Sequence, residues 1–128
     1  MATRATYKFS SKFARDGEVY IYNHWDNYPA GAAEHFFQAL AHSGEYGLLR
    51  AESFIRGNER AEITESHEIH GDTDYRYDID VREQTVTVWH RVFNFNHLDG
   101  SCEDKWELMS HMDVKDFIIE QRKEREAA

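Results

Sequence analysis

The residues best equipped for chemistry lie together between His24 and Gly31, in the sequence His-Trp-Asp-Asn-Tyr-Pro-Ala-Gly. The segment combines an imidazole, a carboxylate and two aromatic rings, and it follows a strand-like pattern and precedes a helix-like one. Side chains and free backbone N–H groups gather where a strand ends and a helix begins. We therefore predict binding residues at His24, Trp25, Asp26 and Tyr28. They do not form a complete catalytic set, and neither does any other segment, so we predict no catalytic residue.

Metal binding is the next chemistry to consider, because the chain has eight histidines. The densest group is His-Glu-Ile-His-Gly-Asp, from His67 to Asp72. A zinc-protease helix places two histidines four residues apart, with a glutamate after the first. His67 and His70 are only three apart, which on a strand sends them to opposite faces. We predict no metal site and no cofactor, and we interpret both histidines as solvated loop and strand residues.

Acidic residues concentrate in the middle of the chain, where Asp74, Asp78 and Asp80 share the polar face of one predicted strand. Like charges two residues apart on one face repel modestly, and a positively charged partner would relieve that repulsion. Acid–base catalysis by such a pair would need one carboxyl to be buried. We expect these three to be solvated and interpret them as an acidic binding patch, with an ordinary solvated face as the alternative.

The overall charge supports a protein partner. Twenty-four acidic residues against fifteen lysines and arginines give a formal net charge of −9. Such a surface repels phosphate backbones, which argues against free nucleic acid as a ligand. It suits a basic partner, including a protein that itself binds nucleic acid. Plain solubility is the alternative explanation.

The compartment is indicated by what the sequence does not contain. No apolar run approaches the roughly 18 residues of a membrane span, and residues 1–10 lack the order of a signal peptide. The single cysteine, Cys102, cannot form an internal disulfide, and its acidic neighbours oppose formation of a reactive thiolate. We expect no membrane association and a reducing, cytoplasmic setting.

A small nucleotide is a second kind of ligand that the residues allow. Stacking surfaces could come from Tyr20, Tyr22, Trp25, Tyr28 and Trp89, and a phosphate could be held by Arg50, Arg56, Arg60, Arg76 or Arg91. One or two such residues suffice for a pocket, so the acidic net charge does not exclude it. The alternative is that these aromatic residues build the core and a subunit interface.

The first half of the chain predicts a hairpin followed by two helices. Strand patterns over 6–10 and 18–24 flank turn chemistry at Asp16-Gly17, and Tyr20, Tyr22 and His24 share one face of the second strand. This face is amphipathic, so we expect another segment to cover it. Asp26 or Asn27 is predicted to cap the first helix, with Pro29 near its first position. The apolar stripe of that helix comprises Ala33, Phe36, Phe37, Leu40 and Ala41, and a second helix is predicted from near Glu45 to Gly57-Asn58.

The second half predicts four strands and a last helix. The strand patterns cover 63–70, 74–81, 85–93 and 105–111, and Asp113 caps a helix that turns Val114, Phe117 and Ile118 inward before fraying into a charged tail at 122–126. The order strand-strand-helix-helix followed by four strands and a helix predicts one α+β domain over residues 1–128. Its sheet should be mostly antiparallel, with five to six strands and about three helices on one face. A homodimer through an edge strand, or through the aromatic face of the first hairpin, is compatible with this pattern.

The segment from His24 to Gly31 resembles the His-Trp-Asp-Gly-Tyr-Pro-type segment of small, uncharacterised proteins of phages and prophages. In those proteins it likewise follows an N-terminal hairpin and precedes a helix that contains alanine and phenylalanine. The resemblance covers residues 6–42 and extends through 56–77. Asn27 stands where a glycine is expected, and because asparagine tolerates a left-handed backbone, we expect the turn to be kept. The resemblance implies no established activity, but short acidic viral proteins are often inhibitors of host systems, including anti-CRISPR and related anti-defence proteins.

Three functions from different classes follow. The first is a non-enzymatic inhibitor that binds a host defence protein through its acidic or aromatic surface. The second is a sponge that sequesters a small nucleotide signal. The third is a small hydrolase or metal-dependent enzyme that uses His24, Asp26 or the segment 67–70.

Overall fold

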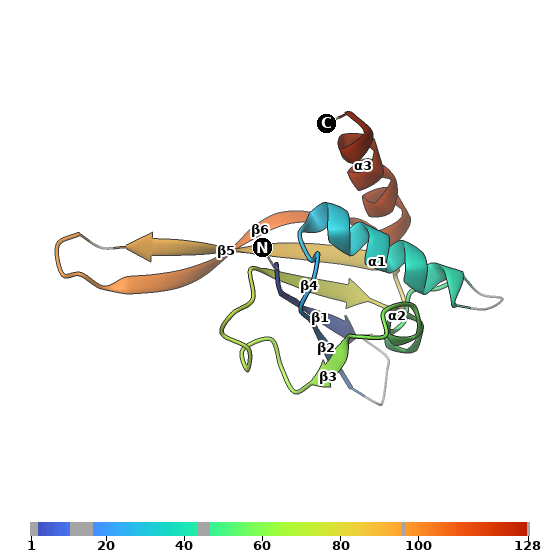
Figure 1. Ribbon diagram of the computed structural model, residues 1–128, viewed down its shortest axis with the longest axis horizontal. Coiled ribbons are helices and arrows are strands. Elements are labelled where there is room, and N and C mark those ends of the chain that lie inside the picture. The colour runs from blue at the N-terminus through green and yellow to red at the C-terminus, as the bar shows by residue number, and fades with distance from the viewer. Residues whose placement is uncertain (1–2, 11–16, 44–46, 96, 128) are drawn as a thin grey trace.

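The computed structural model describes residues 3–10, 17–43, 47–95 and 97–127, and in these parts the elements follow the predicted order (Figure 1). The elements are β1 (Ala5–Ser10), β2 (Val19–Asn23), α1 (Pro29–Ala41), α2 (Ala51–Gly57), β3 (Glu62–Thr64), β4 (Tyr75–Asp80), β5 (Thr85–Phe95), β6 (Cys102–Asp113) and α3 (Val114–Ala127). The α+β class and the order ββααββββα are therefore confirmed. Asp16 and Glu45, which begin the predicted first turn and second helix, lie outside the described residues, as does the side chain of Cys102.

The strands form one six-stranded sheet in the order β3-β2-β1-β4-β5-β6. Every neighbouring pair is antiparallel except β1 and β4, which run parallel from the pair Ala5–Tyr75 to the pair Ser10–Asp80. Parallel neighbours need a long crossover connection, and here α1 and α2 lie within it. The helices α1 and α2 therefore pack over one face of the sheet, against both central strands, β1 and β4.

The core between this face and the helices is built on stacked aromatic rings. Tyr7 of β1 and Tyr77 of β4 are fully buried and stack with their ring centres 4.8 Å apart, and Phe36 of α1 meets both rings edge-on. Burial raises the pKa of both tyrosine hydroxyls well above 10. Neutral hydroxyls inside a core need hydrogen-bond acceptors, and both of these find them in the segment that joins β2 to α1.

The opposite face of the sheet is covered by an irregular segment, residues 65–74. The strand β3 spans Glu62–Thr64, so only residues 63 and 64 of the predicted strand 63–70 pair as a strand, and the chain then turns back over β2. The ring of His70 stacks on Tyr22 at 3.8 Å, and His67 meets Tyr20 edge-on. Burial, and next a hydrogen bond to Asp72, raises the pKa of Tyr22 to about 12. The expectation that another segment covers the aromatic face of the first hairpin is confirmed.

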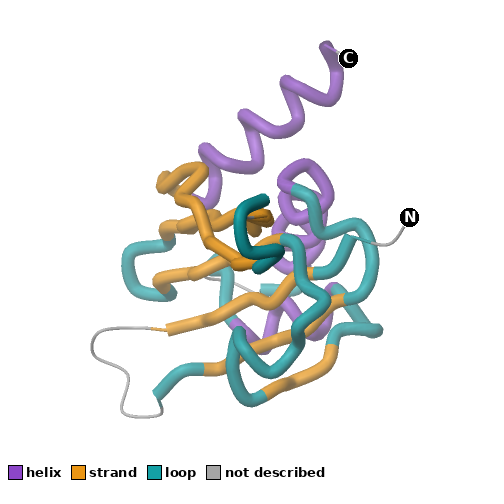
Figure 2. Tube along the Cα trace, turned by 90° about the vertical axis from the view of Figure 1, so that its left-hand side faces the viewer, coloured by secondary structure: helices purple, strands orange, loops and turns teal. Residues whose placement is uncertain are grey.

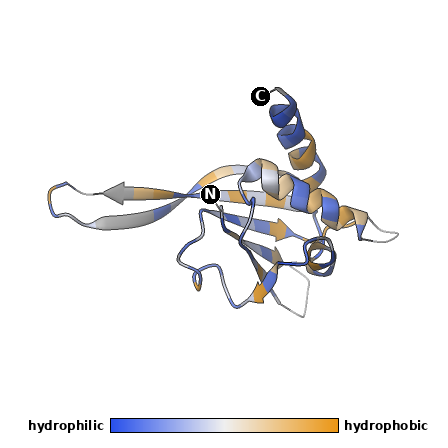
Figure 3. Ribbon diagram, viewed as in Figure 1, coloured by the Kyte–Doolittle hydropathy of each residue, from blue (hydrophilic) through white to orange (hydrophobic). Residues whose placement is uncertain are grey.

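The helices differ from expectation in three respects. In the described residues α2 begins only at Ala51, so the predicted helix is shorter, and α3 continues as a helix to Ala127 instead of fraying. Figures 1 and 2 show that α3 extends away from the rest of the molecule, and Figure 3 shows its outer end to be hydrophilic. Phe37 is 41% exposed and outside the core, and the guanidinium of Arg122 lies 3.9 Å above its ring.

The last hairpin is longer than predicted. The final strand spans 102–113 rather than 105–111, and the hairpin of β5 and β6 projects well beyond the other strands (Figure 1). The pairing register of β5 and β6 shifts between Val88 and Trp89, which leaves Met109 as an extra residue in β6. In the part of the chain that the structure describes, no helix has the length and apolar character needed to cross a membrane.

Candidate functional site

The segment between β2 and α1 is held in place by Asn27, which is fully buried. Its Oδ1 accepts a hydrogen bond from the hydroxyl of Tyr7, and its backbone oxygen accepts one from the hydroxyl of Tyr77 at 2.6 Å. Its Nδ2 lies 2.9 Å from three backbone carbonyl oxygens, those of Thr3, Asn23 and Trp25. The prediction that Asp26 or Asn27 caps α1 is wrong: Tyr28 is the N-cap residue, and its side chain makes no capping bond. Asn27 instead accepts hydrogen bonds from the hydroxyls of the two core tyrosines.

The turn itself is made by Asp26, not by Asn27. Asp26 has a φ of 55°, the left-handed conformation that aspartate and asparagine tolerate better than most residues. The resemblance predicted the left-handed residue at position 27, and this prediction is wrong. The first turn of α1 then packs directly on the turn: a Cβ on Gly31 would lie 1.9 Å from the backbone oxygen of Asp26. Only glycine fits there.

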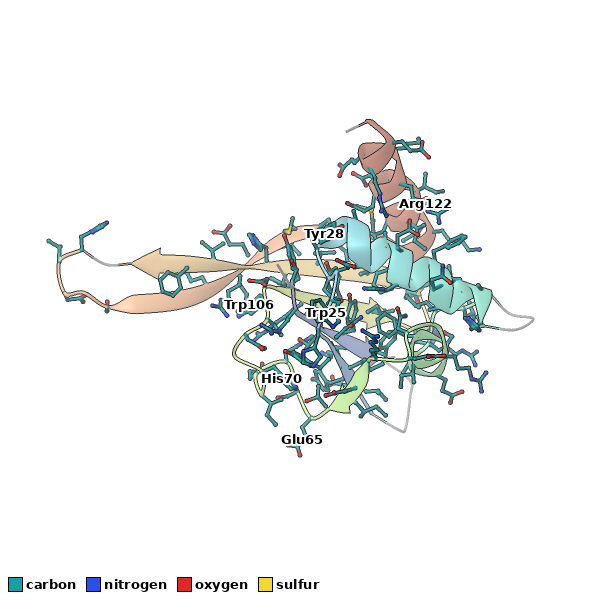
Figure 4. The ribbon with its side chains drawn as sticks, viewed as in Figure 1. Trp25, Tyr28, Glu65, His70, Trp106 and Arg122 are labelled. Carbon is teal, nitrogen blue, oxygen red and sulfur yellow. The ribbon has the colours of Figure 1, made fainter. Side chains whose placement is uncertain are left out.

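This arrangement presents two aromatic side chains to solvent, one on either side of the buried Asn27. Trp25 is 55% exposed and Tyr28 is 42% exposed. Figure 4 shows the two side chains apart from each other. They line different hollows of the surface, Trp25 a cleft of about 390 Å³ beside α2 and Tyr28 a groove of about 430 Å³ between α1, β6 and α3. His24 lines neither of them, because its ring packs edge-on against Tyr22 at 4.5 Å. The four predicted residues of this segment therefore do not form one site.

The cleft at Trp25, which we call the Trp25 cleft, combines residues from three segments. Trp25 and Asp26 come from the turn, His35 comes from α1, and Asn58 and Arg60 follow α2. His35 holds the turn, with its Nε2 3.1 Å from the backbone oxygen of Trp25. Asn58 in turn joins the helices, since its Nδ2 donates to the backbone oxygens of His35 and Phe54 at 3.3 and 2.9 Å. Trp25 and Arg60 thus border one hollow whose volume lies within the range of small-molecule sites.

Sequence reasoning named Trp25, Asp26 and Arg60 but missed His35 and Asn58. Asn58 carried a usable signal, because an asparagine directly after a helix-ending glycine is typical of a helix C-terminus, where its side chain can form hydrogen bonds with the backbone. Gly57 adds to it: a Cβ there would lie 2.9 Å from the backbone of α1, so the two helices approach closely at the cleft.

The three aspartates of the predicted acidic patch have different surroundings. Asp74 is exposed as expected. Asp80 accepts the backbone N–H groups of Arg82 and Glu83 at 3.0 and 3.1 Å and so shapes the turn into β5. Asp78 is only partly solvated, because its side chain is 35% exposed and its carboxylate contacts His67 at 2.7 Å and Trp89 at 3.1 Å. Burial favours its neutral form, but the hydrogen bond and charge of His67 outweigh that effect and lower the pKa of Asp78.

His67 is not solvated, and it joins Asp78 to a hydroxyl. Its side chain is 11% exposed, its Nε2 faces Asp78, and its Nδ1 lies 2.6 Å from Oγ1 of Thr6. A hydroxyl, an imidazole and a carboxylate in line are the parts of a hydrolase triad. A nucleophile must reach its substrate, however, and Thr6 is fully buried between β2 and β4. The arrangement instead ties segment 65–74 to the sheet.

The hydroxyl of Thr64 contacts His70, whose ring lies on Tyr22, so this histidine serves the same covering segment. Across the described residues, no group of three histidine, cysteine or acidic side chains is placed to hold a metal ion.

Comparison of the chain with protein-family models, with curated protein sequences and with solved structures finds no match.

Proposed function

We propose that this protein is a non-enzymatic binding protein, an anti-defence protein of the phage type, and that it inhibits a host defence protein by docking through Trp25. The observation that carries the proposal is the contrast within one turn. Trp25 exposes 55% of its surface, although Asn27, two residues later, is completely buried and hydrogen-bonded on every polar atom of its side chain.

The energetic reason is that a fixed, exposed tryptophan is an efficient anchor. Tryptophan is enriched among the few interface residues that supply most of the binding energy. A loop that is ordered before binding loses little conformational entropy when the partner arrives. The left-handed Asp26, the close approach at Gly31 and the contact from His35 all order this turn in the free protein.

The charge of the molecule favours a basic partner. The net charge is −9, and Asp26 and Glu59 lie in the wall of the Trp25 cleft. Complementary charge raises the association rate and is screened by salt. The predicted acidic patch contributes less than expected, because Asp78 and Asp80 are used within the fold.

The test is an affinity pull-down from a bacterial host lysate with the tagged protein, read by mass spectrometry of both proteins and small molecules. We expect a stoichiometric host protein that is retained by the wild type and lost with Trp25→Ala, at a cost of about 2 kcal/mol or more, or roughly 30-fold in affinity. Phe93→Ala is the matched control, since Phe93 is an aromatic residue on β5 that is 61% exposed, slightly more than Trp25. Retention of the same partner by Trp25→Ala would contradict the docking surface.

A second candidate function, sequestration of a small nucleotide, is supported by the pairing of Trp25 with Arg60 in one cleft. A base can stack on the indole and a phosphate can bind the guanidinium. Asn58 and His35 add polar groups at the same wall.

Calorimetric titration with a panel of mononucleotides and cyclic dinucleotides distinguishes the two functions. Sequestration predicts binding without turnover that is lost with both Trp25→Ala and Arg60→Ala. Docking of a host protein predicts no heat from any nucleotide, and a pull-down whose only product is a nucleotide would move sequestration to first place.

A further inference from the structure

The outer edge of β6 is the longest free strand edge in the described part of the molecule. The sheet order ends at β6, which has 12 residues, whereas the strand at the other edge, β3, has three. The hairpin of β5 and β6 carries this edge beyond the neighbouring strands, and Trp106 lies near the base of that projection (Figures 1 and 4). A long open edge presents unpaired N–H and C=O groups, which is the template on which another strand adds.

The hydrogen bonds of the sheet determine which residues offer those groups. Arg91 donates its N–H to the backbone oxygen of Asp74, so the odd-numbered residues of this part of β5 bond to β4 and the even-numbered ones bond to β6. His90 and Val92 are paired with Glu107 and Lys105.

The backbone groups of Lys105 and Glu107 are therefore directed to β5. Because the direction alternates along a strand, the groups of residues 104, 106 and 108 are directed outward. This outward set is symmetric about Trp106.

We propose that two copies of the chain pair through β6, antiparallel and centred on Trp106, so that one sheet continues across both copies. Trp106 then exchanges two backbone hydrogen bonds with Trp106 of the partner subunit. Leu108 does the same with residue 104 on the other chain. Lys105 faces Glu107 of the partner subunit, and by symmetry this opposite-charge contact is made twice.

The charges select this register against its neighbours. A shift of the two-fold axis by one residue in either direction places Lys105 opposite its own copy or Glu107 opposite its own copy. Like charges directly across two strands destabilise the pairing, and opposite charges stabilise it. The contacts are close ones, since Lys105 and Glu107 occupy the non-hydrogen-bonded positions, where Cα atoms are about 4.5 Å apart.

The side chains at this edge have surface left to bury. Leu108 is 59% exposed and shares the sheet face of Trp106, whose ring is already supported by the guanidinium of Arg76 at 3.9 Å. The extra residue Met109 ends the regular part of the edge, which confines the pairing to the projecting hairpin.

The experiment is the molar mass of the full chain by sedimentation equilibrium over about 1 to 200 µM, at low salt and at about 0.5 M NaCl. We expect a dimer whose dissociation constant rises about tenfold or more with Lys105→Glu and with Glu107→Lys, each of which places like charges together twice. The double variant Lys105→Glu/Glu107→Lys restores opposite charges and should return the wild-type affinity. Lys115→Glu and Glu65→Lys are controls with the same changes of net charge at other exposed positions.

Amide hydrogen exchange gives a second, independent readout. The amides of Trp106 and Leu108 should exchange more slowly as concentration rises, while those of Lys105 and Glu107 are protected at every concentration. A monomeric wild type across the whole range would overturn the proposal. A dimer that both single reversals leave intact, or that the double variant does not restore, would overturn it as well.

Discussion

Replacement of Asn27 by alanine should destabilise the protein strongly, although this asparagine lies in a loop. The loss can be counted group by group. In the variant, the Thr3 carbonyl still accepts a hydrogen bond from the backbone N–H of residue 27, and the Trp25 carbonyl still has His35 as its partner. The buried hydroxyl of Tyr7 loses its acceptor and the Asn23 carbonyl loses its side-chain donor. At about 1–3 kcal/mol for each buried polar group left unpaired, the variant should lose about 2–6 kcal/mol.

Urea unfolding followed by circular dichroism measures this loss, with Asp26→Asn as the control in the same turn. A Tyr7→Phe background provides the sharper test, because that variant has already removed the hydroxyl that Asn27 serves. The cost of Asn27→Ala should therefore be smaller there than in the wild type. Equal costs in both backgrounds, or a loss below about 1 kcal/mol in the wild type, would refute the reasoning. At a temperature where it remains folded, Asn27→Ala should also bind the proposed host partner more weakly, although Trp25 is still present.

Three further outcomes are expected. Gly31→Ala should cost about 3 kcal/mol or more in the free energy of unfolding, because its Cβ would overlap a backbone oxygen, whereas Gly71→Ala, with open space around it, should change stability by less than about 0.5 kcal/mol. Phe36→Ala should cost about 3–5 kcal/mol in denaturant unfolding and the half-exposed Phe37→Ala only about 1 kcal/mol, and equal losses would contradict the assigned core. The lowered pKa of Asp78 means that its stabilisation is present above the usual value of 3.8 and is lost as the pH falls through the lower folded value. Thermal melts should therefore give Asp78→Asn a melting temperature well below that of the wild type at pH 6. The difference in melting temperature should narrow below pH 3.8, and a difference that is constant with pH would contradict this.

The order of elements was predictable because most of them carry a strong period. The alternation over 74–81 gives β4, with Tyr77 and Ile79 buried, and Val114, Phe117 and Ile118 give the inward face of α3. Each of these patterns reflects a single interface between one element and the core, so local sequence contains the information.

Features that depend on distant partners were not predictable in the same way. Asn27 has the chemistry of a helix cap, and only the two tyrosine hydroxyls from β1 and β4 divert it. His67 lies within the predicted strand 63–70, and nothing in that local pattern indicates that Thr6 and Asp78 bury it. The Trp25 cleft likewise joins three segments whose separations in the chain follow no repeat.

The parallel pairing of β1 with β4 has a consequence for synthesis of the protein. Ala5 pairs with Tyr75, seventy positions later, so the central strand emerges from the ribosome long before its second neighbour exists. The hairpin of β1 and β2 can form early, but one side of β1 stays open until β4 has been made. Long-range pairing of this kind slows folding and leaves strand edges exposed to aggregation. Translation that stops before residue 80 should thus yield a nascent chain that depends on chaperones, whereas β5, β6 and α3 add to an edge that is already complete.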